Sequence, residues 1–66
     1  MQYIIKYTIT NNKKGKYIFD TYEQAKEIYI ALAYNLTIKK ARLYRTKGHK
    51  KQLIEQFKKH KKIHIL

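Results

Sequence analysis

The chain has 66 residues, which is room for one domain, and a net charge of +12. It has no cysteine, which excludes disulfides and thiolate metal sites, and its longest apolar run, residues 28–34, is too short to span a bilayer. We therefore expect a single basic domain over residues 1–66, cytoplasmic and without a membrane partner. The excess of lysine over arginine, with abundant Ile and Tyr, is typical of an AT-rich phage or plasmid gene.

The first eighteen or so residues predict a β-hairpin. Residues 2–10 alternate in polarity with the period of a strand, residues 11–15 have turn chemistry, and residues 16–19 return as a second strand. We expect tyrosines at these strand positions to have rings packed in the core and hydroxyl groups exposed to water. The alternative is an aromatic sheet face turned away from the helix, made of Tyr3, Tyr7 and Tyr17.

A helix is predicted over about residues 22–35. Thr21 and Gln24 have the spacing of a capping box, and Glu23 lies in the first turn, where the helix dipole favours negative charge. An apolar stripe recurs every three or four residues, formed by Tyr22, Ala25, Ile28, Tyr29, Leu32, Ala33 and Leu36.

Residues 37–46 predict a third strand, with Ala41 and Leu43 facing the helix and three side chains on the opposite face, Lys40, Arg42 and Tyr44. Lys47 and Gly48 end this strand. Residues 49–62 predict a second, lysine-rich helix with a narrow apolar stripe of Leu53, Ile54 and Phe57. Residues 63–66 fit either a short strand or an apolar tail on the core.

These elements predict a small α+β domain with β-β-α-β-α topology. A right-handed crossover gives a three-stranded antiparallel sheet of order 2-1-3, with the first helix on one face and the basic C-terminal helix beside it. The exposed edge of the second or third strand offers a route to a homodimer.

Positive charge is concentrated in the second half of the chain. Residues 1–36, the hairpin and helix scaffold, carry a net charge of +2, whereas residues 37–66 carry eleven basic groups against Glu55 alone, a net of +10. An anionic partner would relieve the resulting repulsion, and lysine and arginine contacts to phosphate supply most non-specific affinity for nucleic acid.

The predicted contact residues are Lys39, Lys40, Arg42, Tyr44, Arg45, Lys47, Lys50, Lys51, Lys58, Lys59, Lys61 and Lys62, with secondary contacts from Lys13, Lys14 and Lys16. Tyr44 is placed either to stack on an unpaired base or to pack beneath the second helix.

Catalytic, cofactor and metal sites are not expected. The chain has no serine or cysteine to act as nucleophile, and its two glycines form no phosphate-binding loop. His60 and His64 have the i, i+4 spacing of metal ligands, but no carboxylate or thiol is near them in sequence, and the neighbouring lysines would repel a cation.

Residues 15–25 resemble, loosely, a strand-to-helix junction in the arm-type DNA-binding domains of tyrosine recombinases. In both, a strand ends on an aromatic residue, here Phe19, and a capping threonine, here Thr21, leads into a helix with an inward alanine, here Ala25. Those domains place three strands before the helix, whereas two are expected here. The resemblance therefore assigns no function to individual residues.

The sequence thus predicts a nucleic-acid-binding protein that is not an enzyme. We expect weak sequence specificity, because few arginines are available for bidentate base contacts, with DNA favoured slightly over RNA. The alternative is a phage- or plasmid-type accessory protein that inhibits an acidic host protein through the same surface. A membrane-active cationic peptide ranks last, because the predicted second helix has a narrow apolar stripe and no tryptophan.

Overall fold

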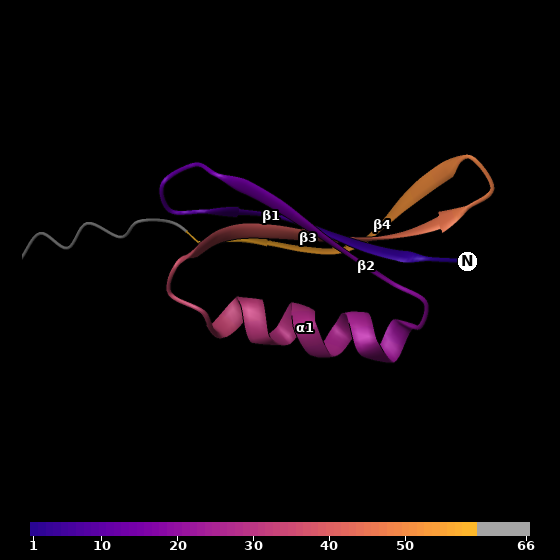
Figure 1. Cartoon of the computed structure of the whole chain (residues 1–66), viewed down its shortest axis with the longest axis horizontal. Helices are drawn as coiled ribbons and strands as arrows, with labels where there is room; N and C mark the ends of the chain where they lie inside the picture. Colours follow the sequence, from indigo (N-terminus) through magenta and orange to yellow (C-terminus); the bar gives the residue numbers. More distant parts are fainter. Residues whose placement is uncertain (60–66) are drawn as a thin grey trace, which may run out of the picture.

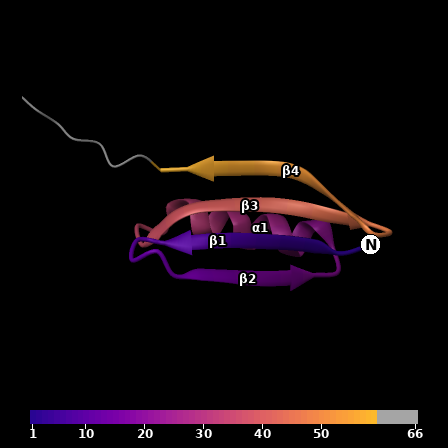
Figure 2. The same ribbon diagram turned by 90° about the horizontal axis from the view of Figure 1, so that it is seen from above.

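The computed structural model describes residues 1–59, which form a four-stranded antiparallel sheet with one helix against one face (Figure 1). The strands follow the order β2-β1-β3-β4, so that β1 and β3 are central and β2 and β4 are the edges (Figure 2). The elements are β1 (Tyr3–Ile9), β2 (Lys14–Phe19), α1 (Tyr22–Tyr34), β3 (Ile38–Lys47) and β4 (Lys50–Lys58).

The β1–β2 hairpin is present as predicted, and its turn depends on local backbone chemistry. Asn12 has φ 69°, a left-handed conformation that asparagine tolerates, and its N–H donates to the carbonyl of Ile9 at 2.8 Å. Gly15 follows at the start of β2, opposite Tyr7. A Cβ at Gly15 would overlap the Tyr7 phenol ring, so the ring can lie over the backbone only because this residue is glycine.

The two ends of α1 are satisfied by different parts of the chain. Thr21 accepts a hydrogen bond from the Gln24 N–H at 3.2 Å, which confirms the predicted N-cap. At the other end the last turn contains no basic residue, and Lys59 donates instead to the carbonyl of Asn35 at 2.6 Å. This ammonium supplies the positive charge that a helix C-terminus favours. Among the described residues, no helix has the length and apolar character needed to cross a membrane.

The core lies between α1 and the two central strands. Its buried members are Ile5, Ala25, Tyr29, Leu32, Ile38, Ala41 and Leu43, so the predicted inward positions on β3 are confirmed. Tyr3 and Tyr7 pack against this cluster, as predicted. Tyr17 lies on the same side but stays 42% exposed, with its ring stacked on Tyr7 at 5.3 Å. Leu36 lies beyond the end of α1 and is 89% exposed, so its place in the predicted stripe is wrong.

The prediction of a three-stranded sheet with a second helix is wrong. Residues 50–58 form β4, which pairs antiparallel with β3, so β3 is a central strand and not an edge. The pairing register shifts between Leu43 and Tyr44, which leaves Ile54 as an extra residue in β4. Of the rest of the predicted helix, residue 49 lies in the β3–β4 turn and residue 59 follows β4. Residues 60–62 of that helix, and the open question of residues 63–66, are outside the described residues.

Candidate functional site

One face of the sheet is covered by α1, and the other is left without a covering element among the described residues (Figure 1). We call the latter the open face. Strand alternation and the pairing register assign to it Ile4, Lys6 and Thr8 of β1, Lys14, Lys16 and Ile18 of β2, Lys40, Arg42, Tyr44 and Thr46 of β3, and Lys51, Leu53, Gln56 and Lys58 of β4. Seven of these residues are basic.

Cross-strand pairing arranges most of the basic side chains in two rows that run across the whole sheet. Following the order β2-β1-β3-β4, the first basic row is Lys14, Thr8, Lys40 and Lys58, and the second is Lys16, Lys6, Arg42 and Gln56. Residues directly opposite on neighbouring strands have Cβ atoms about 4.5–5.5 Å apart. Lys6 therefore has a like charge on each side of it, and Lys40 faces Lys58.

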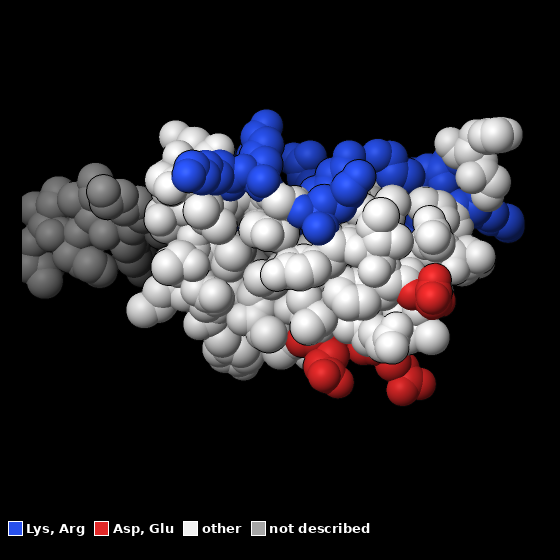
Figure 3. Space-filling model, in the orientation of Figure 1, with Lys and Arg blue, Asp and Glu red and all other residues white. Residues whose placement is uncertain are grey.

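The four acidic residues of the chain are on the other side of the molecule. Asp20 lies in the loop before α1, and Glu23 and Glu27 lie on the helix itself. Figure 3 shows this separation, with basic side chains gathered over the sheet and acidic ones around the helix. Glu55, on β4, faces α1 and forms an ion pair with Lys26.

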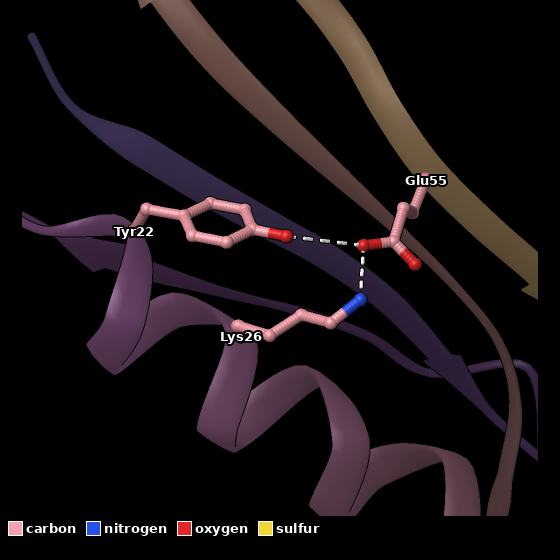
Figure 4. Close-up of polar contacts among 3 residues, drawn as sticks. All are labelled: Tyr22, Lys26 and Glu55. Carbon is pink, nitrogen blue, oxygen red and sulfur yellow. Dashed lines mark hydrogen bonds and ion pairs between the residues drawn. The ribbon is translucent and has the colours of Figure 1, made fainter.

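The Glu55 carboxylate is held by two side chains of α1 (Figure 4). Besides the ion pair with Lys26, it accepts a hydrogen bond from the Tyr22 hydroxyl at 3.4 Å. The hydrogen bond to Glu55 raises the pKa of Lys26. The only acid of β4 is thus already paired on the helix side, so it does not offset the charge of the open face.

Tyr44 lies among cations on the open face. The ammonium of Lys6 is 5.8 Å from the centre of the Tyr44 ring, and that of Lys51 is 5.6 Å from it, both within cation–π range. The two amines also act on each other. Hydrogen-bonding contact with Lys51, and then the like charge of that group, lower the pKa of Lys6.

A shallow depression of about 490 Å³ follows the basic rows over β2, β1 and β3. Its lining comes from three strands and consists of Lys6, Tyr7, Thr8, Lys14, Gly15, Lys16, Lys40, Arg42 and Tyr44. An anion placed there would meet ammonium and guanidinium groups from several directions, which is the arrangement that strengthens phosphate contacts.

The structure brings together about half of the predicted contact residues. Those on the open face are Lys14, Lys16, Lys40, Arg42, Tyr44, Lys51 and Lys58. Lys13 lies beside the β1–β2 turn, and Lys47 and Lys50 flank the β3–β4 turn. Lys61 and Lys62 are outside the described residues.

Three predicted contact residues have other positions. Arg45 is on the helix side, where its Nε donates to Gln52 at 2.9 Å. Lys59 caps α1, and Lys39 lies at the β3 irregularity, where its Nζ donates to the Asn12 side chain at 3.3 Å. Sequence reasoning missed Lys6, although the same alternation that placed Arg42 on the outer face also placed Lys6 there.

Metal-binding chemistry has no counterpart in the described part of the chain. Residues 1–59 contain no group of three or more His, Asp or Glu side chains arranged to hold a metal ion. His49 is exposed in the β3–β4 turn, and the predicted pair of His60 and His64 lies outside the described residues.

Comparison of the chain with protein-family models, with curated proteins and with solved structures gives no match.

Proposed function

We propose that this protein binds nucleic acid through the open face of its sheet. One observation carries the proposal: seven basic side chains from four strands share one face, and all four acids lie elsewhere. Counterion release on contact with phosphates would supply the affinity. The proposal is of a binding protein and not of an enzyme, and a cytoplasmic location, where nucleic acid is available, belongs to it.

The energetics of the free protein support this interpretation. Like charges directly opposite each other in a sheet are destabilising, and here they recur at Lys6–Lys16, Lys6–Arg42 and Lys40–Lys58. No carboxylate is interleaved with them to compensate. A polyanion lying across the rows would replace these repulsions with attractive contacts, whereas solubility alone requires no such one-sided arrangement.

The mode of binding differs from the one that the sequence predicted. A lysine-rich helix over residues 49–62 would have been able to lie in a groove of duplex DNA, but residues 50–58 form a strand. Phosphate contacts therefore come from a sheet surface. Three of the seven basic residues, Lys6, Lys14 and Lys16, come from the first half of the chain.

The test compares two double variants of β3 with the same change in charge. Lys40→Gln/Arg42→Gln removes one lysine and one arginine from the open face, whereas Lys39→Gln/Arg45→Gln removes one of each from other positions. At about 0.15 M salt, loss of two phosphate contacts is expected to weaken binding of a labelled oligonucleotide about tenfold in the first variant. Fluorescence anisotropy measures both affinities.

The control variant should bind nearly as tightly as the wild type. Equal losses in both variants would mean that net charge alone matters, and the open face would then not be the site. If an acidic protein stays bound to the wild-type protein after nuclease treatment of a pull-down, and no oligonucleotide binds in the anisotropy titrations, the alternative of an accessory protein with a host target replaces this proposal.

A further inference from the structure

A third cross-strand row on the open face is apolar. Following the strand order, it consists of Ile18, Ile4, Tyr44 and Leu53. Ile18 is 52% exposed and Leu53 is 43% exposed. The apolar residues of the sheet outside this row, by contrast, are on the side that packs against α1. The apolar row lies beside the second basic row. On β2, β1 and β3 each apolar residue is two positions along its strand from a residue of the second basic row, and on β4 the bulge separates Leu53 from Gln56. Phosphate binding alone gives no use for this row.

The width of the sheet limits how a duplex can meet the open face. Four strands spaced about 4.8 Å apart span about 14 Å between the outer strand axes, before side chains are added. The major groove of B-form DNA is about 12 Å wide and the minor groove about 6 Å. The open face is therefore broader than either groove of undistorted B-form DNA. A duplex that keeps this form could touch the open face only through backbone phosphates and would leave the apolar row without an apolar partner.

We infer that the open face takes single-stranded nucleic acid, with an unpaired base on Tyr44 and the apolar row and with phosphates along the two basic rows. This inference rests on the proposed function and narrows it to one class of ligand. Single-strand binders combine a basic surface for the backbone with aromatic side chains on which bases stack. Here both parts occur on one sheet face, and Tyr44 is the aromatic residue that belongs to it.

The cations around Tyr44 fit this role. In the free protein Lys6 and Lys51 both lie over the phenol ring and repel each other. When a base takes the ring face, the two ammonium groups are displaced toward the phosphates on either side of it. The exchange separates two like charges and gives each an anionic partner, so that stacking and phosphate binding assist each other.

The experiment measures how much of the affinity depends on bases. An unstructured poly-thymidine oligonucleotide, an abasic oligonucleotide of the same length, and a duplex are titrated with full-length protein by fluorescence anisotropy. Wild-type protein is expected to bind the poly-thymidine strand about 5- to 150-fold more tightly than the abasic strand, the effect of one stacked base. The duplex should bind less tightly than the poly-thymidine strand.

Two tyrosine variants show where the base lies. Tyr44→Leu keeps an apolar side chain of similar depth and should bring the ratio of the two single-strand affinities close to one. Tyr34→Leu is the matched control, because Tyr34 is at the end of α1 and 83% exposed, and it should leave the ratio unchanged.

The outcomes separate the inference from the proposed function. If affinity depends on Lys40 and Arg42 but is the same for poly-thymidine and abasic strands, or is highest for the duplex, the single-strand inference fails and the nucleic-acid interface stands. If Tyr44→Leu leaves the base dependence intact, the base lies elsewhere and the inference also fails. If no oligonucleotide shows binding that depends on the open face, both fail.

Discussion

The salt dependence of binding gives a quantitative test of the open face. If all seven of its basic side chains contact phosphates of a single strand, the logarithm of affinity should fall against the logarithm of salt with a slope of about −5. Raising salt from about 50 to about 200 mM would then weaken wild-type binding about 900-fold. Removing Lys40 and Arg42 leaves five contacts, a slope of about −3.5 and a loss of about 130-fold over the same range.

Anisotropy titrations at four or five salt concentrations determine these slopes. The Lys39→Gln/Arg45→Gln variant has the same net charge as the open-face variant, so its slope should stay near the wild-type value. A wild-type slope of about −1 would mean that one or two phosphates are contacted and that the rows do not act together. Equal slopes in the two double variants would refute the assignment of contacts to one face.

Three further predictions concern the fold and the charges around the site. Leu43→Ala removes most of a fully buried side chain, which is expected to lower the free energy of unfolding by about 2–5 kcal/mol. So small a core supplies roughly 3–5 kcal/mol of net stability in all. Circular dichroism at 25 °C should therefore show a largely unfolded chain. The pKa of Lys26 is raised by its hydrogen bond to Glu55, so the stability from this pair is present below the unfolded-state pKa of Lys26 and is lost as pH rises through its folded-state pKa. The difference in melting temperature between wild type and Lys26→Met should therefore shrink in alkaline solution. A difference that stays constant with pH would contradict this prediction. The pKa of Lys6 is lowered chiefly by contact with Lys51, and a bound phosphate would raise it again. Oligonucleotide affinity should therefore fall as pH rises through the lowered pKa of Lys6. This fall should be steeper in wild type than in Lys6→Met.

The first hairpin, the helix and the third strand were predictable because their signals are local. Alternation over residues 2–10 identifies β1, and Thr21 as the N-cap identifies the start of α1. Burial of Ala41 and Leu43 follows from the same alternation in β3. In each case the pattern that identifies the element is contained in a few consecutive residues.

The fourth strand was mistaken for a helix because a bulge disguises its pattern. Leu53, Ile54 and Phe57 have the spacing of a helical stripe, and the lysine, glutamine and glutamate around them favour a helix by propensity. In the structure Ile54 is the extra residue of the bulge, which shifts the phase of alternation between Leu53 and Glu55. Leu53 then lies opposite Tyr44 on the open face, while Ile54 and Phe57 pack against the core. The exposed backbone of β3 supplies hydrogen bonds that intrinsic propensity does not include.

For the candidate site too, the sequence predicts part of the arrangement and the packing of the chain decides the rest. The density of lysine and arginine after residue 37 indicates an anionic partner, and alternation places Lys40, Arg42 and Tyr44 on one face of their strand. It does not show that Arg45 turns toward α1 or that Lys59 caps the helix, since both depend on how β4 and α1 pack.

By itself, the sequence determined the class of the protein: a small α+β domain with an amphipathic helix, a hairpin and a large excess of positive charge. Only the tertiary structure decided which charges lie together on one face. Lys6 and Lys16 belong to the less basic half of the chain, yet pairing of β1 with β2 and β3 sets them in one row with Arg42. Strand register joins residues that are far apart in sequence, and it is set by backbone hydrogen bonds and by burial of the opposite face, neither of which is encoded at any single position.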